Sequence, residues 1–167
     1  MADTVTYTPI ATNTLSSAAA SVTFSSISGT YKDLVCVYTA NTASPVDMSV
    51  RMNGDTGSNY SYTWLSGTGT TTESSRGSNY TRLLLDNYGY PPSAASTYNV
   101  AIIQFMNYSN TTTYKTTLMR SNNAAAGVDA GVGLWRSTSA ITSLVFNFST
   151  GANIASGSVF SLYGIGA

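Results

Sequence analysis

The residue types that most often perform catalysis are scarce in this chain. It has no histidine, so neither a Ser-His-Asp nor a Cys-His arrangement can form. Glu73 is the single glutamate, and it lies in a stretch rich in Ser and Thr. Two carboxylates can hydrolyse a glycosidic bond, but no spacing here indicates such a pair. The only cysteine, Cys36, lies in an apolar run, which indicates a small buried side chain. We therefore expect no enzymatic activity and no catalytic residue.

The sequence also indicates neither a metal site nor a cofactor site. One cysteine and scattered acidic residues do not form a zinc ligand set. We find no P-loop and no dinucleotide-binding fingerprint. The segment 53–59 (NGDTGSN) could offer oxygen ligands to calcium through Asp55, but it lacks alternating acidic residues. Its Asn, Gly, Asp and Ser residues favour a turn instead.

Aromatic residues provide two candidate binding surfaces. Tyr60, Tyr62 and Trp64 alternate with other residues, so they share one face of a predicted strand, and Tyr88 and Tyr90 lie beside two prolines. Tyr and Trp combine apolar area with a hydrogen-bonding group, so either set could bind a sugar or a protein. The alternative is that these side chains belong to the core. We prefer the core for Trp64 and leave both interpretations open for Tyr88 and Tyr90.

The strands that would position these residues follow a period of two. Residues 46–52 and 60–66 alternate in this way on either side of the turn segment 53–59, and together they predict a β-hairpin. Residues 32–39 are apolar on both faces, which suits a central strand of a sandwich. Residues 98–107 form the strongest apolar run, and they too carry apolar side chains on both faces.

The whole pattern predicts an all-β protein. We expect an antiparallel β-sandwich of jelly-roll type with about eight to ten strands, because short alternating runs recur with turn signals between them. Three segments lack a hydrophobic period and predict loops, namely 66–79, 87–97 and 121–131. We expect residues 1–20 to form an extended N-terminal arm and residues 21–167 to form a single sandwich domain.

Charge is unusually sparse. Charged residues make up 8% of the 167 residues, against about 25% in ordinary domains, and seven basic residues balance seven acidic ones. The absence of a charge cluster argues against nucleic acid and against an anionic membrane surface as partners. A net charge near zero favours self-association. The N-terminus lacks the pattern of a signal peptide, and no stretch is long and apolar enough to span a bilayer. We therefore expect the protein to be made and kept in the cytosol, or in an assembly formed there.

Five segments together carry a resemblance to a known group of proteins. They are SVTFSSISGTYKDLV (21–35), RMNGDTGSNYSYTWLSG (51–67), NYSNTTTYKT (107–116), GLWRSTSAITSLVF (133–146) and SVFSLYGIGA (158–167). In these segments the chain resembles small β-rich virion structural proteins of tailed bacteriophages, in particular those of cyanophages, and among them capsid cement (decoration) proteins. The shared segments are strands and turns, and they transfer no catalytic residue.

The resemblance implies a structural protein. It implies a homo-oligomer, expected to be a trimer, that lies over capsomer junctions on the capsid surface of the virion and stabilises the shell. The implied partners are further copies of the chain and the major capsid protein. The arm at 1–20 could add a strand to the sheet edge of a neighbouring subunit, with Tyr7 and Ile10 as its anchors.

A second role stays open from the same resemblance, that of a receptor-binding domain of a tail fibre or tailspike. In that role the loops 66–79 and 87–97 would present Tyr88 and Tyr90 to a host glycan. The chain begins with Met and shows no fibrous shaft or attachment domain, so we expect the cement role.

Overall fold

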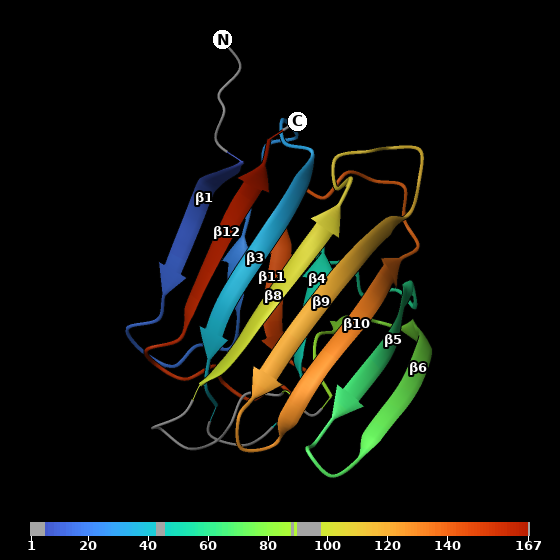
Figure 1. Cartoon of the computed structure of the whole chain (residues 1–167). Coiled ribbons are helices and arrows are strands. Elements are labelled where there is room, and N and C mark those ends of the chain that lie inside the picture. The colour runs from blue at the N-terminus through green and yellow to red at the C-terminus, as the bar shows by residue number, and fades with distance from the viewer. Residues whose placement is uncertain (1–5, 43–45, 88, 90–97, 167) are drawn as a thin grey trace.

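The computed structural model describes residues 6–42, 46–87, 89 and 98–166. Its twelve strands form two antiparallel sheets that pack face to face as a β-sandwich of jelly-roll type (Figure 1). The predicted fold class is therefore confirmed, with more strands than the expected eight to ten. Within the described residues, no helix is long and apolar enough to cross a membrane.

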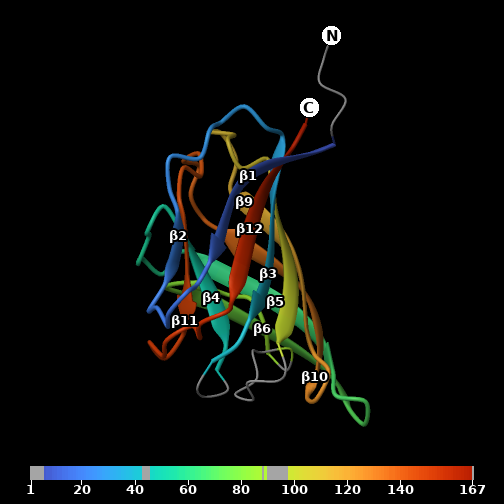
Figure 2. The same cartoon turned by 90° about the vertical axis from the view of Figure 1, so that its left-hand side faces the viewer.

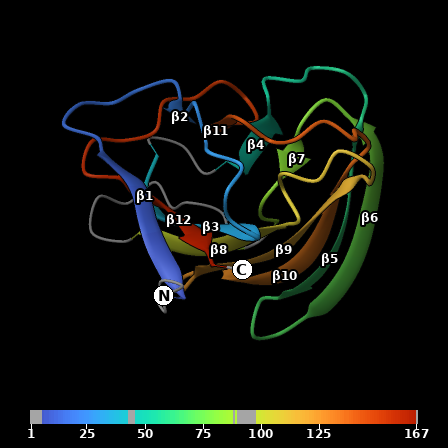
Figure 3. The same ribbon diagram turned by 90° about the horizontal axis from the view of Figure 1, so that it is seen from above.

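The larger sheet has eight strands and the smaller has four. The order in the large sheet is β1 (Tyr7–Thr14), β12 (Val159–Ile165), β3 (Asp33–Ala40), β8 (Asn99–Met106), β9 (Lys115–Asn123), β10 (Gly127–Trp135), β5 (Tyr60–Gly67) and β6 (Thr72–Tyr80). The order in the small sheet is β2 (Val22–Phe24), β11 (Leu144–Phe148), β4 (Met48–Met52) and β7 (Leu83–Leu84). Figure 2 shows the two sheets edge-on as separate layers, and Figure 3 shows the large sheet curving from β1 to β6 along one side of the small sheet.

The core lies between the two sheets because each strand turns alternate side chains inward. On β8 these are Ala101, Ile103 and Phe105, none of which is more than 1% exposed. From the small sheet, Phe146 reaches into the same layer, and its ring lies 5.5 Å from that of Phe160 on β12. The alternation visible in the sequence thus becomes an inner face that holds the sheets together by burying apolar area.

The predicted hairpin over 46–66 is wrong. β4 pairs with β11 and β7 in the small sheet, whereas β5 pairs with β10 and β6 in the large sheet. The segment 53–59 therefore crosses from one sheet to the other. The buried Tyr60 hydroxyl group accepts a hydrogen bond from the backbone N–H of Met52 at 3.2 Å. This bond joins the start of β5 to the end of β4 across the segment. Alternation is the same in a hairpin and in a crossing, so it does not distinguish between them.

Two of the predicted loops contain strand residues. The segment 66–79 holds most of β6, and 121–131 holds the end of β9 and the start of β10. β6 has no hydrophobic period because its side chains are largely exposed, and its backbone pairing with β5 keeps it in the sheet. At the end of the β9–β10 hairpin that falls in 121–131, the buried inward residues are polar, among them Ser121 and Asp129. A pattern sought in apolar residues therefore misses both segments.

The N-terminal segment differs from the expected extended arm. Residues 7–14 form β1, an edge strand that pairs with β12 of the same chain, with a register shift between Pro9 and Ala11. This pairing satisfies backbone groups along the outer edge of β12, which would otherwise lack a partner. Residues 1–5 lie outside the described part of the chain.

Candidate functional site

The most unusual feature of the molecule is the outer face of the eight-stranded sheet, the face turned away from the small sheet. In an antiparallel sheet that meets water, the outer face is normally polar. Here the central strands β5, β8, β9 and β10 carry large exposed apolar side chains on it. We call these side chains the apolar patch: Leu65, Ile102, Met106, Leu118, Val128 and Val132 are 64%, 37%, 37%, 47%, 57% and 50% exposed.

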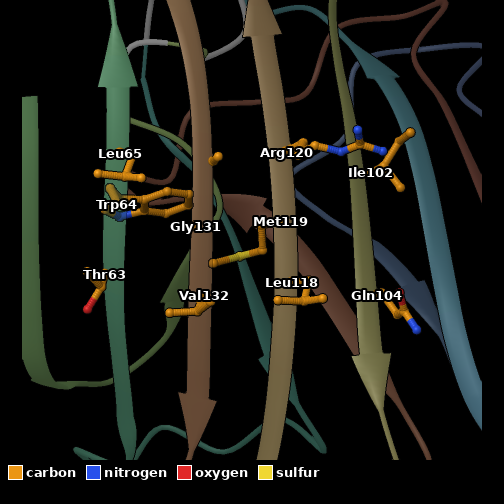
Figure 4. A pocket seen from close by; sticks show the side chains of 11 residues that line it. Thr63, Trp64, Leu65, Ile102, Gln104, Leu118, Met119, Arg120, Gly131 and Val132 are labelled. Atoms are coloured by element: carbon orange, nitrogen blue, oxygen red, sulfur yellow. The ribbon is translucent and has the colours of Figure 1, made fainter. Parts of the chain in front are cut away.

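Strand register assembles the patch. Val132 on β10 lies opposite Leu118 on β9, and Leu118 lies opposite Gln104 on β8. One row away, Arg120 on β9 lies opposite Ile102 on β8. Directly opposite residues of paired strands point to the same face, so these side chains form continuous rows across the sheet. Figure 4 shows the two rows side by side, with Leu65 extending the upper one on β5.

The patch lines two shallow depressions with volumes of about 530 and 580 Å³. Both include Thr63, Leu118 and Val132, so they adjoin one another on the face. The first also takes in Leu65 and Ile102. The depressions are open and mainly apolar, and this shape and chemistry suit contact with another protein surface better than the binding of a charged molecule.

The four strands that carry the patch add little charge to it, and Arg76 on the adjoining strand β6 lines the second depression. In β5, β8, β9 and β10, all of which the structure describes, Arg120 is the one charged side chain that points outward. Lys115 and Asp129 lie on the inner face and are almost completely buried. The Lys115 ammonium group donates hydrogen bonds to the carbonyl oxygens of Thr113 and Thr138, at 2.8 and 3.1 Å. Burial lowers the pKa of Lys115, because the interior disfavours the charged form.

Buried acidic residues tie the sheets together at one end of the sandwich. Asp86, which is 1% exposed, accepts a hydrogen bond from the backbone N–H of Met48 at 3.1 Å and one from the Tyr38 hydroxyl group at 3.4 Å. Asp129 accepts one from the backbone N–H of Asn87 at 2.7 Å. Sequence reasoning assigned no role to these residues, because an isolated Asp gives no local signal of burial.

The carboxylate of Asp55, in the turn at 53–59, is hydrogen-bonded to groups of the protein itself. Asp55 accepts hydrogen bonds from Trp135 Nε1 at 2.7 Å, from Asn59 Nδ2 at 2.9 Å and from the backbone N–H of Gly57 at 2.7 Å. Burial raises the pKa of Asp55, but these three bonds together outweigh that effect and leave the pKa below its ordinary value. The segment is a turn, as predicted, and its carboxylate fastens it to β10.

The aromatic alternation on β5 faces the core. Tyr60 and Trp64 are 0% and 2% exposed, so the preferred core position of Trp64 is confirmed, and Tyr62 is half-buried. The Trp64 ring lies over Gly131 on the neighbouring strand β10, where a Cβ atom would come within 2.3 Å of it. Figure 4 shows this ring reaching toward Gly131. The glycine therefore creates the space that the indole occupies beneath the patch.

We expect Gly131→Ala to lower the free energy of unfolding by about 1–3 kcal/mol, because the added methyl group forces the Trp64 ring out of place. Urea denaturation followed by tryptophan fluorescence measures the change. Gly67→Ala is the matched control, since a Cβ there meets nothing within 4 Å. Equal stabilities for Gly131→Ala and the wild-type protein would show that the ring can move aside freely.

The structure describes two of the four predicted site residues, Tyr7 and Ile10. Tyr7 is 51% exposed on β1, and its ring packs edge-to-face against Tyr163 at 6.3 Å. The register of β1 with β12 places Tyr7 on the same outer face as the patch, at its far edge. Ile10 is half-buried and packs on the core of its own chain, so it is not free to anchor a neighbour. Tyr88 and Tyr90 lie outside the described residues.

Sequence reasoning did not identify the patch itself. The available signal was the presence of apolar residues on both faces of 32–39 and 98–107, the segments that become β3 and β8. Strands of this kind are typically covered on both sides. The small sheet covers one side, and the patch lies on the other.

Comparison with known proteins informs the fold alone. No protein-family model matches the chain, and no curated protein matches it. Among solved structures, Caenorhabditis elegans galectin LEC-6 shares 10% identity over 87% of this chain and 90% of its own, with a TM-score of 0.37. The alginate lyase Aly36B, in a complex with an alginate tetrasaccharide, shares 9% identity over 75% of this chain and 70% of its own, with a TM-score of 0.27.

Proposed function

We propose that this protein is a structural component of a phage virion, a cement protein that binds the capsid surface as a homo-oligomer and stabilises the shell. Its partners are further copies of the chain, in the expected trimer, and the major capsid protein at capsomer junctions. The single observation that carries the proposal is the outer face of the eight-stranded sheet, which is broad and mainly apolar, with Arg120 the one outward charged side chain on β5, β8, β9 and β10.

The free energy of burying such a face favours an assembly over a monomer free in solution. Burying apolar side chains between proteins is favourable by roughly 25 cal/mol for each Å² removed from water. Burying charged groups is costly, and here only Arg120 would incur that cost on the four central strands. The resemblance of five segments to virion proteins adds the capsid as the place of assembly.

Imaging of purified virions by cryo-electron microscopy tests the proposal. We expect density for this sandwich at many equivalent positions over capsomer junctions, because a cement protein contacts every copy of a repeating lattice. Density confined to the tail tip would overturn the cement role. It would favour the receptor-binding alternative, and a glycan-binding screen would then be the next measurement.

A binding assay on capsids that lack the protein gives an independent measure. We expect the wild-type protein to bind at a fixed ratio to the capsid protein and to raise the temperature at which the capsids release their contents. Binding without any rise in this temperature would contradict a stabilising role.

A further inference from the structure

The apolar surface extends beyond the patch across the large sheet. On β3, Val35 and Val37 point to the outer face, because they lie opposite Gln104 and Ile102 of β8. On β12, Tyr163 lies opposite Val35 and continues the same row. The outer face therefore carries apolar side chains on six adjacent strands, from β5 to β12, with polar residues such as Asp33 and Ser161 among them.

No further layer in the described part of the chain covers this face, although Val35 is only 5% exposed between its neighbours. The small sheet lies on the opposite side of the large sheet, as Figures 2 and 3 show. Leu65 and Val128 are more than half exposed, which is unusual for large apolar side chains that share one face with several others.

We propose that the outer face of the eight-stranded sheet is the interface between copies of this chain. This inference rests on the proposed function and deepens it, since it names the surface through which the subunits of the cement protein meet. Apolar sheet faces pack on one another at about 10 Å with their side chains interdigitated, as in the interior of a sandwich. Another copy of the chain supplies such a face with the same composition.

The available area matches what a stable assembly requires. Six strands spaced about 4.8 Å apart, each of about eight residues rising 3.3 Å, present roughly 750 Å². Two such faces would bury roughly 1,500 Å² in total, which lies within the range of about 1,200–2,000 Å² for stable protein interfaces. The apolar patch alone, on four strands, would reach only about two-thirds of this area.

The charges and polar groups are also compatible with a second copy. The chain has seven basic and seven acidic residues, so two copies do not repel each other through net charge. On the six strands, Arg120 and Asp33 are the charged side chains that point to this face. Asp33 already accepts a hydrogen bond from the backbone N–H of Asn107 at 2.7 Å, whereas Arg120 requires an acceptor once it is covered. Gln104 lies on the same face and donates through Nε2 to Asp33 at 2.8 Å, so its amide oxygen can accept from Arg120 of another copy. Arginine is also among the residues enriched at interfaces.

Sedimentation velocity on the purified full-length chain tests this inference in the absence of capsids. At about 100 µM, we expect the wild-type protein to sediment as an oligomer of the 17.5 kDa chain. Val132→Glu places a charge in the centre of the patch and is expected to weaken association by more than about 100-fold. Thr23→Glu is the matched control, because Thr23 is exposed on β2 of the small sheet. It should leave the mass unchanged.

The outcomes distinguish the alternatives. A wild-type protein that is monomeric at this concentration would overturn the inference. A Val132→Glu variant that remains oligomeric would also overturn it. Leu118→Gln keeps the side-chain volume and serves if Val132→Glu does not fold; circular dichroism and the thermal midpoint establish folding for each variant. We expect Leu118→Gln also to weaken association, and an unchanged oligomer would count against the inference.

Failure of the inference and failure of the proposed function can be told apart. A monomeric protein that still binds capsids would leave the cement role in place and would indicate that the outer face contacts the capsid. An oligomer that dissociates with Val132→Glu but never binds capsids would support the inference and overturn the cement role. Two identical faces that pack on one another form a dimer, so a dimer would support the interface and correct the expected trimer, whereas a trimer would overturn this interface.

Discussion

Phe146→Ala is expected to lower the free energy of unfolding by about 3–5 kcal/mol. Phe146 is completely buried on β11, at the centre of the contact between the two sheets. Its ring lies 6.2 Å from that of Phe24, 6.4 Å from that of Tyr38 and 5.5 Å from that of Phe160. Truncation removes buried apolar area and leaves a cavity lined by rigid rings, which cannot collapse easily to fill it.

Urea denaturation measured by circular dichroism gives the size of this effect. Val145→Ala is the matched control, because Val145 is the neighbouring residue on β11, is half-buried and points away from the core. We expect its cost to be about 1 kcal/mol or less. A cost below about 1.5 kcal/mol for Phe146→Ala would mean that the two sheets are held together mainly elsewhere.

Asp86→Asn is expected to make the protein more stable at alkaline pH while changing little at acidic pH. Burial raises the pKa of Asp86 well above its ordinary value, and the nearby charges of Asp47 and Asp129 raise it further. Hydrogen bonds from Met48 and Tyr38 favour the charged form but do not outweigh burial. The folded protein therefore binds a proton at Asp86 more tightly than the unfolded chain does.

The sign of the pH dependence follows from linkage. The contribution of Asp86 to stability is fully present below the pKa of the unfolded chain, about 3.9, and is lost as the pH rises through the higher folded pKa. Each pKa unit of difference corresponds to about 1.4 kcal/mol. Asparagine does not ionise, so the variant lacks this loss. It should exceed the wild-type protein in stability by more than about 1.4 kcal/mol at pH values above the folded pKa.

Free energies of unfolding measured between acidic and alkaline pH in urea test this prediction. Asp55→Asn is the comparison with the opposite sign, because the pKa of Asp55 is lowered. Asp55 contributes stability above the unfolded pKa, and this contribution is lost as the pH falls through the folded pKa. Parallel pH profiles for Asp86→Asn and the wild-type protein would show that the proton affinity of Asp86 does not change on folding.

Local alternation in the sequence was sufficient to predict an all-β sandwich and the orientation of several side chains. The core position of Trp64 follows from a period of two, since successive residues of a strand point to opposite faces. The turn at 53–59 follows from its Asn, Gly and Asp residues, which satisfy their own backbone. The low charge of the outer face follows from composition, because a chain with few charged residues cannot place many anywhere.

Only the tertiary structure decided which strands pair. β4 and β5 adjoin in the sequence but belong to different sheets, because each pairs through backbone hydrogen bonds with strands far along the chain. β6 is a strand through its pairing with β5 alone, so its own side chains do not reveal it. Likewise, β1 is an edge strand because its backbone pairs with the outer edge of β12. Such partners are selected by long-range contacts, which a local pattern does not contain.

The tertiary structure also decided which residues form the candidate site. Leu65, Ile102, Leu118 and Val132 are spread over almost seventy positions of sequence, and only strand order and register bring them onto one face. The sequence by itself determined that β3 and β8 are apolar on both sides. The fold decided which side the small sheet covers and which side is left for a partner, because a sheet can bury only one face against a single second layer.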